Sequence, residues 1–308
     1  MLAVFLKTLP FFALIGTGWL AGRLRFFTAD ATAWLTRFVF YFALSAMLFR
    51  FAATLDLAAL FDLRFVLAYL VGSLAVWALG FAAARRRGVP PPEAAMEAHT
   101  GMTGNTGFLG VPMLVVLLGE PAVGPVLMVL TLDMIVFSTL ITLIVAGVGH
   151  GRMSPAVLLA LVRGIFANPM ILSMAAGLAW AAARLPLPGP AAEYLALLGA
   201  AATPGALFAI GASLAYRPVR RIGPALWLSL LKLVIHPAAV GISALLFGVT
   251  PVAAGVMVAA AALPVAGNVY ILAHYFRLAE ERVSAAILVS TAISIATIPI
   301  VIHLIPKG

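Results

Sequence analysis

Two short polar motifs interrupt apolar stretches of this sequence and carry its best anion-binding chemistry. The first is Thr103-Gly104-Asn105-Thr106, and the second is Gly267-Asn268. Asparagine amides and threonine hydroxyls donate hydrogen bonds, and glycine leaves neighbouring backbone N–H groups accessible. A carboxylate only accepts hydrogen bonds, so it matches such a set of donors. The predicted substrate-binding residues are Thr103, Gly104, Asn105, Thr106, Gly267 and Asn268.

The same stretches contain residues that interrupt a helix. Proline costs about 3 kcal/mol and glycine about 1 kcal/mol relative to alanine in a helix interior, so Pro112 and Pro264 are predicted to mark breaks. Inside a membrane, backbone freed of hydrogen bonds must be buried in protein or line a cavity, and paired interruptions point to a transport site. Half-helix N-termini meeting there would attract a carboxylate. In the alternative interpretation, Asn105 and Asn268 only satisfy the broken backbone.

Two opposite charges, Asp133 and Lys232, lie deep within apolar stretches. A charge at the centre of a membrane helix costs about 2.5–3.5 kcal/mol on insertion scales, so opposite charges at one depth are predicted to pair. The pair either stabilises the crossing of the broken helices or binds and releases a coupling proton. His236 lies one helical turn beyond Lys232, so these two side chains are expected to share an environment.

The composition places these motifs in a membrane protein. Hydrophobic residues make up 64% of the chain and charged residues 9%, whereas a soluble domain has about 25% charged residues. The lipid bilayer is therefore the expected environment. The net charge of +9 is attributed to cytoplasmic loops, and no nucleic-acid partner is expected. The lack of cysteine excludes disulfides and thiolate ligands, and no histidine spacing or other motif indicates a metal or cofactor.

The apolar runs predict an all-α integral membrane protein with ten transmembrane helices. A spanning helix needs about 20 mainly apolar residues. The predicted spans are 3–22, 31–52, 63–84, 94–118, 122–147, 165–183, 192–215, 222–247, 251–275 and 283–304. The segment 149–166 is predicted to contain an interfacial linker helix.

The distribution of cationic residues agrees with this count. Twelve of the 19 lysine and arginine residues fall on one side of the predicted topology and five on the other. The richer side should be cytoplasmic, so both termini are expected on the outer, periplasmic side of the inner (plasma) membrane. Arg37 and Arg50 fall near the two ends of the second span and are expected to extend to the membrane interfaces.

The two halves of the chain resemble each other. Residues 43–49 align with 202–208 at an offset of 159, and Gly104-Asn105 aligns with Gly267-Asn268 at an offset of 163. Five spans is an odd number, so the second half would enter the membrane inverted, as in many secondary transporters. We predict a first five-helix repeat at 1–148, the linker at 149–166 and a second, inverted repeat at 167–308.

These residues resemble the auxin efflux carrier family, in its bacterial branch of malonate and malate permease-like proteins. The resemblance extends over the whole chain and is most specific from Gly104 to Pro112. Four other places share the resemblance: residues 10–16 with Gly22 and Arg23, residues 37–44, Asn168-Pro169, and Pro264 to Asn268 with Tyr270. Ser45 departs from the family, which often has proline at this place.

The resemblance implies a 5+5 inverted repeat in which helices 4 and 9 are broken and cross, similar to bile-acid/sodium symporters and sodium/proton antiporters. Helices 1, 2, 6 and 7 would form a scaffold unit, and helices 3–5 and 8–10 a transport unit that moves by an elevator mechanism. It implies a carboxylate at Asn105 and Asn268, such as malonate, malate or an auxin-like acid. A proton or sodium as coupling ion, and a homodimer, are left open.

Two other classes of function require residues that differ from those present. A cation/proton antiporter would use Asp133 as its ion-binding carboxylate, but such antiporters usually place more carboxylates at the crossing. An intramembrane aspartate protease needs a second deeply placed aspartate, and the sequence also lacks the aspartate-rich motif of a prenyltransferase and the Gly-x-Ser-Gly motif of a rhomboid protease. The sequence therefore favours a carrier over an enzyme.

Overall fold

A computed structural model describes residues 2–55, 62–150, 159, 162–163, 166–216 and 222–305. The described chain is helical, and seven of its helices are long and apolar enough to cross a membrane. They are Phe5–Arg23, Ala29–Ala53, Leu63–Arg86, Glu120–Val145, Gly189–Ala215, Ile222–Leu246 and Glu280–Leu304. Three shorter apolar helices are Thr106–Leu118, Pro169–Ala182 and Pro251–Ala261. The all-α membrane class is confirmed, and the count of ten crossings stays a prediction.

The helices of the first half follow the predicted spans closely. They are α1 (Leu2–Arg23), α2 (Ala29–Phe38), η1 (Val39–Ala43), α3 (Leu44–Ala53), α5 (Leu63–Arg86), α6 (Pro91–Met102), η2 (Thr106–Gly110), α7 (Val111–Leu118), η3 (Glu120–Ala122), α8 (Val123–Thr131), η4 (Leu132–Phe137) and α9 (Ser138–His150). The span predicted at 94–118 is divided between α6 and the continuous pair η2–α7. The first half therefore contains one interrupted helix.

The second half contains the other interrupted helix. Its elements are α11 (Pro169–Ala182), α12 (Gly189–Ala200), α13 (Ala202–Ala215), α14 (Ile222–Leu230), η5 (Leu231–Ile235), α15 (His236–Leu246), α16 (Pro251–Ala261), α17 (Gly267–Phe276) and α18 (Glu280–Leu304). The span predicted at 251–275 is divided between α16 and α17. Most of the predicted interfacial linker, 149–166, lies outside the described residues.

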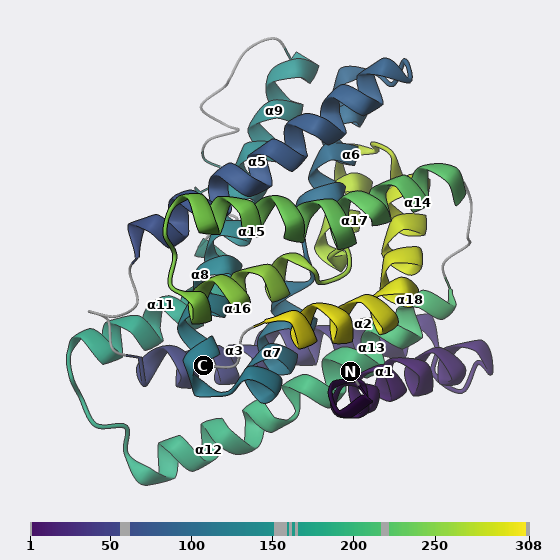
Figure 1. Ribbon diagram of the computed structural model, residues 1–308. Helices are drawn as coiled ribbons and strands as arrows, with labels where there is room; N and C mark the ends of the chain where they lie inside the picture. The colour runs from purple at the N-terminus through teal and green to yellow at the C-terminus, as the bar shows by residue number, and fades with distance from the viewer. Residues whose placement is uncertain are drawn as a thin grey trace.

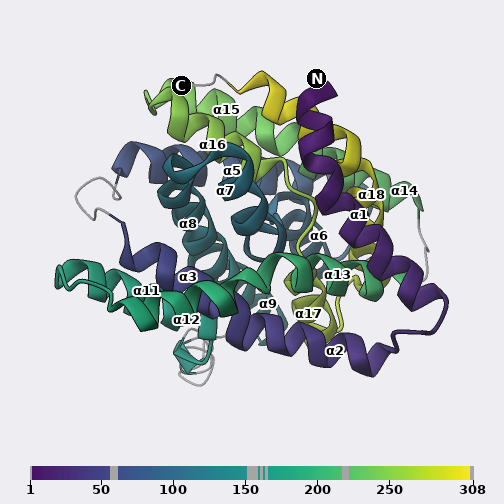
Figure 2. The same cartoon turned by 90° about the horizontal axis from the view of Figure 1, so that it is seen from below.

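The helices gather into two groups (Figure 1). One group, in the lower part of that view, comprises α1, α2, α3, α11, α12 and α13, where α13 packs on α1 and α2, and α3 packs on α11 and α12. The other group includes α5, α6, α14, α15 and α16, with α15 packed on α5 and α16. The view from below shows the first group lying across the helices of the second (Figure 2). The second group thus contains the first halves of both broken helices, α6 and α16, and η2 contacts α13 of the first group.

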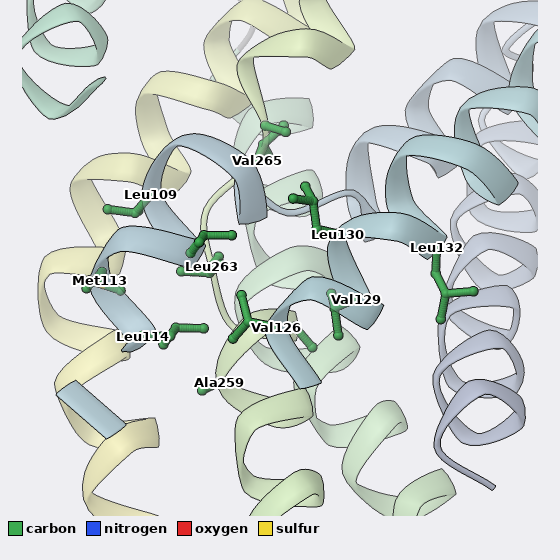
Figure 3. Close-up of a cluster of buried hydrophobic side chains, with 14 of the residues drawn as sticks. Leu109, Met113, Leu114, Val126, Val129, Leu130, Leu132, Ala259, Leu263 and Val265 are labelled. Carbon is green, nitrogen blue, oxygen red and sulfur yellow. The ribbon is translucent and has the colours of Figure 1, made fainter. Parts of the chain in front are cut away.

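An apolar core surrounds the breaks (Figure 3). Leu109, Met113 and Leu114 come from η2 and α7, and they pack with side chains of α8 and with residues of α16 and the segment after it. Labelled members of this cluster include Val126, Val129, Leu130, Ala259, Leu263 and Val265. The core excludes water from the flanks of the interrupted backbone, so the hydrogen bonds of the breaks must be satisfied within the protein.

Among the described residues, four segments are π-helical turns, each widened by one residue: η1, η2, η4 and η5. Two serine hydroxyls donate to carbonyls within such turns. Ser45 Oγ donates to the carbonyl of Phe40 at 3.0 Å, and Ser138 Oγ donates to the carbonyl of Asp133 at 3.1 Å. π-helical turns occur frequently at functional sites, and here η4 contains Asp133 and η5 contains Lys232.

Close packing of α1 on α13 depends on glycine. A Cβ atom on Gly18 would lie 2.1 Å from the carbonyl oxygen of Phe208, and one on Gly211 would lie 1.9 Å from the carbonyl oxygen of Ile15. Small residues allow such close backbone approach, and the resulting van der Waals packing favours helix association in lipid. Since backbone atoms cannot move aside like a flexible side chain, the two helices would have to separate.

We expect Gly18→Ala to lower the free energy of unfolding by about 1–3 kcal/mol, the usual cost of overpacking. Gly16→Ala is the matched control, because Gly16 lies on the same helix and has nothing within 4 Å of its Cβ position. Thermal unfolding in detergent would compare the two variants. Equal stability of the two would show that α1 and α13 do not pack as closely as described.

A buried carboxylate joins the α5–α6 turn to α18. Glu97 is 1% exposed and forms an ion pair with Arg87. Its other oxygen lies 2.8 Å from Nε of Arg282, and Arg282 also binds Glu93. Buried carboxylates need such partners because desolvation is costly. This cluster holds α6 to α18, and thereby fixes the first half of one broken helix against the last helix of the chain.

Candidate functional site

The two helix breaks lie side by side and hydrogen-bond to each other. Gly104 and Val265 form an antiparallel bridge. Asn105 N donates to the carbonyl of Pro264 at 2.8 Å, and Ala266 N donates to the carbonyl of Thr103 at 3.2 Å. Each break therefore supplies the backbone partners that the other lacks. This pairing explains how two stretches of non-helical backbone are tolerated within an apolar core.

A third helix completes the hydrogen bonding of the second break. Val265 N donates to Ser290 Oγ on α18 at 3.0 Å, and the Ser290 hydroxyl donates to the carbonyl of Ile287 at 3.2 Å. Ser290 is fully buried. Its role could not be predicted from the sequence, since a single serine in an apolar helix most often bonds to its own helix.

The N-termini of η2 and α17 are presented at the meeting point. The first N–H groups of a helix have no partner within it and carry the positive end of the helix dipole. Gly267 and Asn268 at the start of α17 are exposed, and nothing lies within 4 Å of the Cβ position of Gly267. This end of α17 is therefore open to a ligand, and helix N-termini bind anions.

Two asparagine side chains lie at these N-termini with their amides uncommitted. Asn105 precedes η2 without capping it, and its side chain is 7% exposed. Neither its amide nor that of Asn268 hydrogen-bonds to a residue that the structure describes. The backbone of the breaks is already satisfied by main-chain pairing and by Ser290. The amides are thus free to bind a ligand, which weakens the alternative in which they only repair the backbone.

The two predicted threonines have protein partners. Thr106 Oγ1 donates to Asp133 Oδ2 at 2.9 Å. Thr103 Oγ1 lies 3.3 Å from His99 Nδ1, and both side chains are buried. Their contacts make them supports of the breaks, and direct binding of a substrate by either hydroxyl stays a prediction.

Asp133 lies beside the N-terminus of η2. Tyr69 OH donates to its Oδ1 at 2.8 Å, and Thr106, the first residue of η2, donates to its Oδ2. Asp133 is 4% exposed. A negative charge near a helix N-terminus is stabilised by the dipole of the helix. The carboxylate therefore anchors the start of the second half of the broken helix.

Lys232 lies beside the C-terminus of α16. Its Nζ donates to the carbonyl of Ala261, the last residue of α16, and lies 3.0 Å from His236 Nδ1. An ammonium group has only donors, so His236 accepts at Nδ1 and its Nε2–H faces Ser73 Oγ at 2.9 Å. The predicted shared environment of Lys232 and His236 is confirmed. A cation at a helix C-terminus is stabilised by the dipole.

Gly104 provides the space for Lys232. A Cβ atom at this position would lie 3.2 Å from Lys232 Nζ and from the carbonyl oxygen of Ala260. The absence of a side chain thus lets the ammonium group reach the end of α16. Gly104 serves the helix crossing through this contact as well as through its bridge to Val265.

Two details of the sequence predictions need correction. Asp133 and Lys232 form no direct ion pair; they interact electrostatically at longer range, and each has its own hydrogen-bond partners. Pro112 does not mark a break, because η2 continues into α7 through it. The first break lies at 103–105, where main-chain pairing with 264–266 replaces the helix, whereas Pro264 does lie in the second break.

Comparisons with known proteins agree with a transport site. Residues 3–302 match the sequence profile of a family described as "Membrane transport protein". A relative described as "Putative malonate transporter", from Rhizobium meliloti (strain 1021), is 35% identical over 306 residues, which cover 97% of this chain and 95% of the relative. Both matched regions contain the two breaks and the residues around them.

Proposed function

The chain belongs to this membrane transport family, the auxin efflux carriers, and from that premise we propose that it is a secondary transporter of small organic anions. The substrate class is a carboxylate such as malonate, malate or an auxin-like acid. It binds where the two broken helices cross and is moved by an elevator-type alternating-access mechanism. The protein resides in the inner membrane with its arginine-rich side in the cytoplasm and both termini outside.

The observation that carries this proposal is the chemistry of the crossing. The open N-terminus of α17 and two uncommitted asparagine amides converge beside paired backbone. All of these groups donate hydrogen bonds, and carboxylates accept them. The name of the relative from Rhizobium meliloti points to malonate. A dicarboxylate would suit a site in which two helix N-termini approach each other.

The arrangement of helices supports the proposed repeat. In the 5+5 scheme, 1–148 and 167–308 are inverted copies, and α6–η2–α7 corresponds to α16–α17. The group formed by α1, α2, α3, α11, α12 and α13 corresponds to the scaffold unit, and the remaining helices to the transport unit. Shearing between these two groups would carry the crossing from one side of the membrane to the other.

The contacts of Asp133 argue against a cation/proton antiporter. Both carboxylate oxygens accept hydrogen bonds, from Tyr69 and Thr106. A cation site needs several oxygen ligands directed at one point, whereas the crossing presents mainly donors. Coupling to a proton or to sodium, and the homodimer that the family resemblance implies, stay predictions.

Ligand binding to the purified protein tests the proposal. Thermal unfolding in detergent would be followed with malonate, malate, indole-3-acetate and other mono- and dicarboxylates, beside sodium and lithium chloride. A ligand that binds only the folded state raises its stability by about 2.7 kcal/mol at one hundred times its Kd. We expect at least one carboxylate to raise the melting temperature. Stabilisation by sodium or lithium alone would overturn the anion proposal in favour of the antiporter.

A further inference from the structure

A pocket lies between the two groups of helices, near the crossing. It has a volume of about 500 Å³, and its lining residues belong to α2 and the end of α13 on one side and to α17 and α18 on the other. Its lining includes Thr32, Thr36, Arg37, Ser213, Tyr270 and Ser284. This volume is in the range of small-molecule sites, about 300–1,000 Å³.

The pocket lies on the arginine-rich side of the protein. It is bordered by the first turns of α2, which follow Arg23 and Arg25, and by the start of α18, next to Arg282. Tyr270 connects it to the crossing, because it lies on α17 just after Asn268. Helix α13 also packs against η2. A ligand leaving the crossing on this side would enter the pocket.

Three hydroxyl groups of the pocket wall have little capacity to donate to an anion. Thr32 Oγ1 donates to the carbonyl of Thr28 at 2.9 Å, and Thr36 Oγ1 donates to that of Thr32 at 2.7 Å. Ser213 Oγ donates to the carbonyl of Ile210 at 2.8 Å. A hydroxyl has a single hydrogen to donate. These three side chains therefore present acceptor lone pairs to the pocket.

Arg37 supplies the donors and the charge that these hydroxyls lack. It is exposed, and its guanidinium lies over the ring of Trp34, 4.8 Å from the ring centroid. It forms no ion pair with any carboxylate that the structure describes. Stacking on an aromatic ring uses the face of the guanidinium and leaves its N–H groups free. The sequence predicts that Arg37 extends to the membrane interface, whereas the structure places it in the lining of a pocket.

We propose that this pocket is an anion-binding vestibule, in which Arg37 binds a carboxylate of the substrate on the arginine-rich side of the membrane. The inference rests on the proposed function and adds a second site to it. A guanidinium fork matches a carboxylate in geometry as well as charge. The substrate would be held at Arg37 between release from the crossing and diffusion into water, and in the reverse order during loading from that side.

Transport measured separately from each side of the membrane tests this inference. Uptake of radiolabelled malonate would be followed in right-side-out and inside-out vesicles containing wild type or Arg37→Gln. The chain has no cysteine, so labelling of Arg86→Cys with an impermeant maleimide identifies the vesicles that expose the arginine-rich side. We expect Arg37→Gln to raise the KM measured from the arginine-rich side about tenfold, because loss of one charge-assisted hydrogen bond weakens binding by about this factor. The KM measured from the other side should stay unchanged.

Three further variants make the result specific. Arg50→Gln removes the same charge from the opposite end of the same spanning helix and should leave both KM values unchanged. Arg37→Lys keeps the charge but not the fork, and an intermediate KM is expected. If Arg37→Gln keeps the wild-type KM from both sides, while Asn105→Ala with Asn268→Ala blocks uptake, the vestibule alone would be overturned. Failure of wild type to transport any carboxylate would overturn the proposed function as well.

Discussion

Asn105→Ala is expected to weaken carboxylate binding about tenfold or more, and Asn105→Ala with Asn268→Ala to abolish measurable transport. A hydrogen bond to a charged group contributes about 1.5–3 kcal/mol, and each 1.4 kcal/mol is a factor of ten in affinity. The Asn105 amide has no partner among the described residues, so its removal leaves no protein group unsatisfied. Affinity should fall while stability without ligand stays within about 0.5 kcal/mol of wild type.

Asn168→Ala is the matched control for this loss of an amide. Asn168 Oδ1 accepts from the N–H groups of Met170 and Ile171 at 3.0 and 3.4 Å and caps α11. Loss of an N-cap costs about 1 kcal/mol. Asn168→Ala should therefore lower the melting temperature and keep the carboxylate affinity, which is the reverse of the result expected for Asn105→Ala. If Asn105→Ala and Asn168→Ala both keep the wild-type affinity, the carboxylate does not bind at the crossing.

An isosteric charge change separates the contact from the shape of the site. Asn105→Asp keeps the size of the side chain but places a negative charge beside the helix N-termini. It should exclude a carboxylate more strongly than alanine does, because like charges repel in a partly buried site. Calorimetric titration with the carboxylate that stabilises wild type would rank the three proteins. Binding of Asn105→Asp as tight as wild type would contradict an anion site at this position.

The location of the crossing could be predicted because its signals are local. Glycine, proline and asparagine within an apolar run disfavour a continuous helix wherever the run lies in the fold. The sequence therefore predicts breaks in the fourth and ninth spans, and both are present. Within span four the break was predicted at Pro112. The structure shows that a widened turn, η2, precedes the proline and that the interruption lies at 103–105.

The partners of the buried charges were missed because they are not local. Depth along a helix indicates that Asp133 and Lys232 lie near one plane, but it does not tell which faces of their helices meet. Tyr69, which binds Asp133, is 64 positions away in the chain, and Ser73, which faces His236, is 163 positions away. Only the one-turn spacing from Lys232 to His236 gave a local signal, and this contact is present.

The separated charges indicate how the crossing is stabilised. Four half-helix ends meet at the breaks, and each carries about half an elementary charge. Asp133 lies at the positive end of η2 and Lys232 at the negative end of α16. Each charge thus compensates a helix end, and a direct ion pair would leave both ends without a partner. This favours the structural interpretation of the two residues over a proton-binding pair.

Lys232→Met is therefore expected to lower the free energy of unfolding by about 3–5 kcal/mol, because it leaves the negative end of α16 without its cation and removes the longer-range attraction to Asp133. It also removes the donor from the Ala261 carbonyl. Asp133→Asn should cost less, about 1–2 kcal/mol, because the amide oxygen still accepts one of the two hydrogen bonds made by Tyr69 and Thr106. The matched control is Lys7→Met, which removes a lysine far from the crossing, near the start of α1.

A double-mutant cycle then separates stabilisation of the crossing from proton coupling. If the charges act on one structural unit, Asp133→Asn with Lys232→Met should be more stable than the sum of the single losses predicts, by about 0.5–3 kcal/mol. Unfolding in detergent measures this difference. Transport by Asp133→Asn, measured from pH 5 to pH 8, should keep the pH dependence of wild type at a lower rate. Loss of that pH dependence in a variant of near-normal stability would contradict the structural role and favour Asp133 as the proton-binding group.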